Sequence, residues 1–222
     1  DISETEGVFN FKNTYASPQR IIQVTGSTPE KIITTINQNM NAIYSALYFN
    51  EIQEKQRRIA KNLNQTQAIK KSTGLTLRFP SAYRVAKVDT NFVWIRRDIE
   101  TGSVNLFISR YNDKNNSSIL KIRDSISKHH IPGPVENTFM SIDPIYTPNS
   151  QQINIGGKQI LETRGLWEIQ GQFMAGPFLN YRFKSDTKQD EYIMLDGFVY
   201  SPGSSKREYV FELEAIMRSI KN

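Results

Sequence analysis

The densest group of chemically capable side chains in the sequence is Arg164, Trp167 and Glu168, in a segment that alternates like a β-strand. Arginine and tryptophan are enriched among the residues that supply most of the energy at protein interfaces. The group therefore predicts a recognition patch on the strand. Phe178, on the next predicted strand, would extend the same patch.

The alternative is structural: Trp167 would belong to the core, and the nearby arginine would form an ion pair with Glu162 or Asp124, because buried arginines are generally paired. Gly165 lies between the arginine and the tryptophan, where it permits a β-bulge or the close approach of another backbone. Arg123, beside Asp124 on a predicted helix, completes this part of the candidate binding set.

Two more cations could hold an anion. Lys206 and Arg207 fall in the first turn of the last predicted helix, where positive charge opposes the helix dipole. A bound anionic group would offset this cost. Solvation, or pairing with Glu208 or Asp190, would also offset it, because exposed charges interact weakly.

Catalysis would need carboxylates that converge. Glu162 and Glu168 share one side of a strand, but six residues at about 3.3 Å each place them roughly 20 Å apart, beyond the separation that glycoside hydrolysis uses. Asp124, Asp196 and Glu214 could meet only through the tertiary fold, which keeps a hydrolase as the alternative function. The sequence has no Gly-x-Ser-x-Gly motif of a serine hydrolase. We therefore assign no catalytic residue.

Metal and cofactor sites are not indicated. His129 and His130 are the two histidines, and adjacent side chains on a helix point about 100° apart. They cannot hold one ion without a third ligand such as Asp143. The chain has no cysteine, which excludes a disulfide scaffold, a thiolate zinc site and a cysteine nucleophile. We expect no cofactor and no metal.

Composition indicates a globular protein. The chain has 222 residues, of which 38% are hydrophobic and 23% charged, too apolar for disorder and too evenly charged for a membrane-spanning helix. Its 28 basic and 22 acidic residues give a net charge of +6. This excess is modest for a chain of such length and disfavours nucleic acid as a partner.

Helical spacing dominates the first third of the sequence. Ser27 and Glu30 fit a capping box around Pro29, and apolar residues then recur at helical spacing as far as Ile52. A short second helix should end at Gly74. We therefore predict an N-terminal helical segment over residues 1–74, with a short strand near residues 21–24.

From residue 75 the apolar period changes to two, which predicts a sheet domain over residues 75–222. The predicted strands cover 75–79, 92–96, 104–108, 139–142, 151–155, 159–169, 178–183 and 192–200. Helices are predicted over 115–130 and from residue 204 to the end. The fold class is α+β, a mainly antiparallel sheet flanked by a long N-terminal, a middle and a C-terminal helix.

Three blocks carry a family resemblance: residues 122–134 (IRDSI leading to IPGP), 162–178 (ETRGLWE leading to FMAGPF) and 197–216 (GFVYSP leading to KR and LEAI). Together they resemble the domain of unknown function 4837 family, predicted lipoproteins of Bacteroides-group bacteria, from about Tyr15 onward. A weaker likeness, of pattern alone, is to PsbP-type sandwich domains.

The resemblance implies a location and no activity, cofactor or site. We expect the cell envelope, lipid-anchored or periplasmic, with the membrane reached only through a lipid anchor outside this chain. Residues 1–74 would then be the remainder of a larger N-terminal subdomain, with an incomplete sheet edge near residues 21–24.

The leading hypothesis is a non-catalytic envelope protein. It would bind another envelope protein or a small anionic ligand through the sheet face near Arg164, Trp167 and Phe178. A purely structural role as an assembly subunit fits the same sequence.

Overall fold

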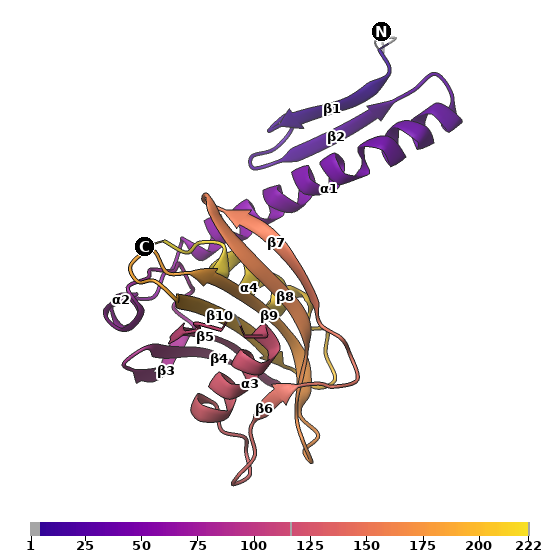
Figure 1. The fold of residues 1–222 in the computed structure, drawn as a ribbon. Helices are drawn as coiled ribbons and strands as arrows, with labels where there is room; N and C mark the ends of the chain where they lie inside the picture. The colour runs from indigo at the N-terminus through magenta and orange to yellow at the C-terminus, as the bar shows by residue number, and fades with distance from the viewer. Residues whose placement is uncertain (1–4, 116, 222) are drawn as a thin grey trace. The chain divides into compact units, whose positions relative to one another are not determined.

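The structure is a computed structural model that describes residues 5–115 and 117–221. The chain forms two compact units, Asp1–Arg58 and Ile59–Asn222 (Figure 1). The sequence placed its boundary later, between residues 74 and 75. The difference arises because the short second helix packs against strands of the second unit.

The first unit is a hairpin followed by a long helix. Strands β1 (Gly7–Lys12) and β2 (Arg20–Thr25) pair antiparallel, and α1 spans Pro29–Ile59. The helix cap is Thr28, whose hydroxyl accepts the N–H of Lys31 at 3.3 Å, and not Ser27 as the capping box predicted. Side chains of residues 5–51 are exposed or half-buried.

The second unit is built on one antiparallel sheet in the order β3-β4-β5-β10-β9-β8-β6, with β7 also paired to β8. Its strands are β3 (Arg84–Asp89), β4 (Phe92–Ile99), β5 (Gly102–Asn112), β6 (Met140–Ile142), β7 (Asn149–Ile155), β8 (Lys158–Ile169), β9 (Ala175–Lys184) and β10 (Glu191–Tyr200). The predicted α+β class with a mainly antiparallel sheet is confirmed. Strands β1 and β3 were not predicted.

Helices α3 (Ile119–His130) and α4 (Arg207–Met217) contact opposite faces of this sheet (Figure 1). Successive residues of β10 show which helix covers which face, because neighbouring residues of a strand point to opposite faces of the sheet. Asp196 bonds to Arg123 of α3, whereas a Cβ on the next residue, Gly197, would lie 3.2 Å from the side chain of Leu213 of α4. We call these the α3 face and the α4 face.

The α3 face buries an aromatic core. Its members come from six strands, from α3 and from the residue after α3: Phe92, Phe107, Ile119, Ile131, Met140, Trp167, Ile169, Phe178, Met194 and Phe198. Aromatic rings of this size dominate the area that a core removes from water. The α4 face buries a larger share of aliphatic residues, including Leu106, Leu179 and Leu195 of the sheet and Leu213 and Ile216 of the helix, together with the aromatic residues Tyr181 and Phe183.

Residues 75–80 alternate as predicted but do not form a strand of the sheet. Leu75, Leu77 and Phe79 are buried, while the segment pairs through isolated bridges, one of them between Thr76 and Lys221. Helix α2 (Gln67–Thr73) precedes it and ends at Gly74 in the left-handed conformation, as predicted.

Candidate functional site

Trp167 and Phe178 lie in the core of the α3 face, each with 2% of its surface exposed. The indole packs edge-on against Phe198 at 5.7 Å between ring centroids. A Cβ on Gly165 would come within 2.7 Å of the Phe178 ring, so this glycine permits the ring to cross β8. These two aromatic residues cannot form an exposed recognition patch, and the core alternative describes them.

Arg123 holds the only carboxylate on β10 that points into the α3 face. Its Nε and Nη2 donate to the two oxygens of Asp196 at 2.8 and 3.0 Å, and Asn180 donates a third hydrogen bond to that carboxylate at 2.8 Å. The guanidinium lies 3.9 Å from the centroid of the Phe178 ring. Burial raises the pKa of Asp196, and the hydrogen bonds and charge of Arg123 oppose this shift.

Asp124 has a structural role at the end of β6. Its Oδ1 accepts the N–H of Ile142 at 2.8 Å, which ties α3 to that strand. Burial raises the pKa of this carboxyl above its ordinary value.

Arg164 joins two buried glutamates on the α4 face. Its Nε donates to Glu162 at 2.9 Å and its Nη2 to Glu214 at 2.8 Å. Glu162 also accepts from Gln151 at 2.8 Å, and Glu214 from Arg218 at 3.0 Å. Burial alone would raise the pKa of Glu162, but its hydrogen bonds from the arginine and the glutamine lower it. The Arg164 side chain stays 41% exposed, so this network reaches solvent.

The remaining predicted binding residues lie apart from these networks. Glu168 is half-buried near the end of β8, where it pairs with Ser141 of β6. Lys206 precedes α4, and its ammonium donates to the carbonyl of Ser204 at 2.9 Å. Arg207 is exposed at the first position of α4. The predicted set is thus spread over both faces and one helix start.

The carboxylates of the alternative hydrolase site do not converge. Asp196 is fully buried on the α3 face and Glu214 is buried on the α4 face, so the sheet separates them. Asp124 is already bonded to the backbone of β6. This geometry overturns the proposed convergence.

Metal ligands are not grouped in the described part of the chain, where no three His, Asp or Glu side chains are placed to hold an ion. His130 instead stacks on Phe92, with ring centroids 3.9 Å apart and an interplanar angle of 7°. Burial, with smaller contributions from Lys87 and His129, lowers the pKa of His130. Among the described helices, none combines the length and apolar character needed to span a membrane.

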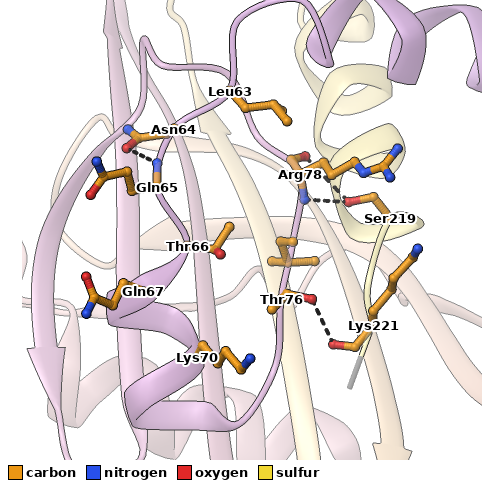
Figure 2. A pocket seen from close by; sticks show the side chains of 11 residues that line it. Leu63, Asn64, Gln65, Thr66, Gln67, Lys70, Thr76, Arg78, Ser219 and Lys221 are labelled. Carbon is orange, nitrogen blue, oxygen red and sulfur yellow. Dashed lines mark hydrogen bonds between the residues drawn. The ribbon is translucent and has the colours of Figure 1, made fainter.

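A hollow of about 690 Å³ lies at another part of the second unit (Figure 2). We call it the basic hollow; it is lined by Leu63, Asn64, Gln65, Thr66, Gln67, Lys70, Thr76, Leu77, Arg78, Ser219 and Lys221. Three of these described lining residues are cations and none is acidic. The sequence analysis missed this site. Alternation over residues 75–79 could have shown that Arg78 points outward, but the pairing with residue 221 had no local signal.

Two of the outer strands of the sheet, β7 and β3, differ in the features that hinder pairing with another chain. Strand β7 pairs with β8 on one side, in unbroken register from Asn149 to Ile155, and its seven residues carry no charge. Strand β3 at the other edge carries Arg84, Lys87 and Asp89 and has an irregularity between residues 85 and 87. Charges and bulges are devices that stop an edge strand from pairing with another chain. The β7 edge lacks both.

Comparison with known proteins adds two family matches. Residues 62–219 match the family described as "Domain of unknown function (DUF4837)", and residues 2–60 match a second "Domain of unknown function (DUF8532)". The resemblance read from the three sequence blocks is confirmed, but the DUF4837 match begins at residue 62 and not near Tyr15. No curated protein matches the chain.

Among solved structures, the chain is similar to the Ran-binding protein Mog1p of Saccharomyces cerevisiae, with 9% identity and a TM-score of 0.39 over 66% of this chain and 89% of that one. The DUF4837 match covers most of the chain and nearly all of the unit that contains the sheet. The protein therefore belongs to the DUF4837 family, a family of unknown function.

Proposed function

We propose that this protein is a non-catalytic binding or assembly module of the cell envelope, and that it receives an extended segment of a partner protein at the open edge of β7. The observation that carries the proposal is the contrast between the unprotected β7 edge and the charged, irregular β3 edge. The carboxylates considered for catalysis support it, because they are held in internal bonds on separate faces.

A strand edge is a binding surface in itself. The outward N–H and C=O groups of an edge strand can pair with an added strand, and main-chain hydrogen bonds then supply affinity while alternate side chains supply specificity. Along β7, Ser150 and Gln152 point to the α3 face, and both are exposed. The partner in this proposal is an extended segment that pairs with β7 in either the antiparallel or the parallel direction. Its residues are uncharged, or polar and apolar residues alternate along it.

The envelope location is supported by the resemblance to predicted lipoproteins. Cell fractionation of the full-length protein tests it: recovery with membranes or periplasm is expected, and recovery with the cytosol would remove the location while leaving the β7 surface in place.

A site-specific photo-crosslinker tests the binding surface. Placed at Gln152 in the full-length protein in its own cells, the crosslinker should give a discrete adduct; at Val88, which is 51% exposed on β3, it should give none. Mass spectrometry should map the adduct to an extended segment. A peptide of that segment should slow hydrogen exchange at β7 amides and not at β3 amides. Equal adducts at both positions, or none at Gln152, would overturn the proposal.

The variant Gln152→Lys supplies a matched loss of function. A lysine on an edge strand blocks strand addition without affecting the core. It should abolish the adduct formed from a neighbouring crosslinker at Ser150, whereas Val88→Lys should leave that adduct unchanged.

A further inference from the structure

We infer that the basic hollow is a binding site for a phosphate-type oxyanion that carries more than one negative charge. The site is separate from the β7 edge, and the inference goes beyond the proposed function. It rests on the lining of the hollow and on the way the chain brings its cations to one side.

The first step is the alternation of residues 75–79. Leu75 and Leu77 are buried in the second unit, so the residues between and after them must point outward. Thr76 is half-buried and Arg78 is exposed, as this alternation requires. The apolar anchors thus fix the direction of the Arg78 side chain, although the residue itself is on the surface.

The second step is the pairing with the end of the chain. The N–H of Thr76 donates to the carbonyl of Lys221 at 2.8 Å, and the N–H of Lys221 donates back to Thr76 at 3.0 Å. Two residues further, the N–H of Arg78 donates to Oγ of Ser219 at 2.8 Å. Residues paired in this way point to the same side, and so do those two positions along. Figure 2 shows Arg78 and Lys221 extending on the side of Ser219.

The third step is electrostatic. Lys70 of α2 adds a third cation to the lining, and the lining has no carboxylate among its described residues. Like charges on neighbouring strand positions are unfavourable. Most other arginines described in the sheet unit are paired with a carboxylate, as Arg123 is with Asp196 and Arg182 with Asp113. A multiply charged anion would supply the countercharge that the hollow lacks.

The fourth step is ligand chemistry. An arginine fork matches phosphate oxygens bidentately, and lysines bind phosphate as point charges. Neutral side chains of Gln65, Thr66 and Gln67 line the same space and can donate to further oxygens. No aromatic side chain is in the lining, so the described hollow offers no stacking surface for a nucleobase or sugar ring. A compact oxyanion fits best.

The volume of about 690 Å³ is in the range of small-ligand sites. The same phosphate chemistry could come from a soluble phosphate ester or from a lipid headgroup at a membrane surface. Both sources use one set of cations, and the experiment separates them.

Calorimetric titration of the full chain with inorganic pyrophosphate tests the site. We expect one site, tighter than for sulfate, with Arg78→Gln weakening binding about tenfold or more, and Lys70→Gln and Lys221→Gln each weakening it several-fold. The matched control is Lys121→Gln, an exposed lysine on α3, which should bind like the wild type. No binding by the wild type to pyrophosphate or to vesicles, or equal weakening by all four variants, would overturn the inference.

Vesicles containing phosphatidic acid form the second arm. Co-sedimentation that depends on Arg78 and is competed by pyrophosphate would identify a lipid headgroup as the source; pyrophosphate binding without co-sedimentation would identify a soluble ligand. Thermal unfolding of each variant checks that the fold persists. Because purified protein is used and β7 is unaltered, failure here leaves the proposed function standing, and the converse also holds.

Discussion

The two faces of the sheet differ in how they bury a carboxylate. Each buries a carboxylate that an arginine holds, Asp196 by Arg123 on the α3 face and Glu162 by Arg164 on the α4 face. On the α3 face both partners are sealed, with side chains 1% and 0% exposed. On the α4 face the arginine is 41% exposed.

The difference teaches where an ion pair can matter for stability. Both charges of a sealed pair have lost their hydration, so removing one partner leaves the other as a buried charge without a counter-ion. A pair that reaches water can be replaced in part by solvent and by its other neighbours. The α3 face should therefore be intolerant of single changes, and the α4 face tolerant.

The strongest test of this comparison is Arg123→Ala. It leaves Asp196 buried without its cation, and we expect the free energy of unfolding to fall by about 3–5 kcal/mol, measured by urea denaturation. The double variant Arg123→Met with Asp196→Leu should recover much of that loss, because two apolar groups no longer need pairing. A loss below about 1 kcal/mol for the single variant would show that the pair is not sealed.

Gly165→Ala tests packing on the same face. The new Cβ would meet the Phe178 ring at 2.7 Å, where the core around Arg123 leaves little room to move. Overpacking of this kind costs about 1–3 kcal/mol, which thermal and urea unfolding would both report. Gln152→Ala, on an exposed position of β7, is the control and should be near neutral. An unchanged Gly165→Ala protein would mean that the aromatic core is loosely packed.

Arg164→Gln should cost less, about 1 kcal/mol in urea denaturation. Glu162 keeps its hydrogen bond from Gln151, and Glu214 keeps Arg218, so neither carboxylate is left alone. A cost equal to that of Arg123→Ala would erase the distinction between the two faces.

Local pattern predicted much of this arrangement. Alternation at Val104, Leu106 and Ile108 placed β5, and the spacing of apolar residues placed α3 and α4. Strand β3 was not predicted because an edge strand needs few apolar residues. Its apolar residues are Val85, Val88 and one alanine. Residues 75–80 were assigned to the sheet because alternation looks the same whether the partner is a full strand or an isolated bridge.

The sites were less predictable because their members come from distant segments. Pairing of Arg164 with Glu162 is local and was among the alternatives, whereas its bond to Glu214 depends on α4 docking on the sheet. Arg123 selects Asp196 over its neighbour Asp124 because the turn of α3 directs it at β10. Chain-distant pairing also hid the basic hollow, which joins residue 78 to residue 221.

The smallest expected effect is the loss of stability at acid pH that arises from Glu162 on the α4 face. Hydrogen bonds to Glu162 lower its pKa in the folded protein below the ordinary value of 4.5. Between the lowered pKa of the folded protein and the ordinary value of 4.5, the carboxyl of Glu162 binds a proton more readily in the unfolded chain than in the folded one. The free energy of unfolding therefore falls as the pH drops through 4.5 and below. The advantage of wild type over Glu162→Gln in urea denaturation should therefore be present near neutral pH and shrink below this value.

The Arg164→Gln background decides whether that loss belongs to the ion pair. Without the guanidinium, Glu162 retains only the neutral amide of Gln151 among its described hydrogen bonds, and the pH-dependent part of the difference should become smaller. Glu136→Gln, an exposed change, controls for the general effect of acid. If the dependence is the same with and without Arg164, the hydrogen bond from Gln151, and not the ion pair with the arginine, is what lowers the pKa of Glu162.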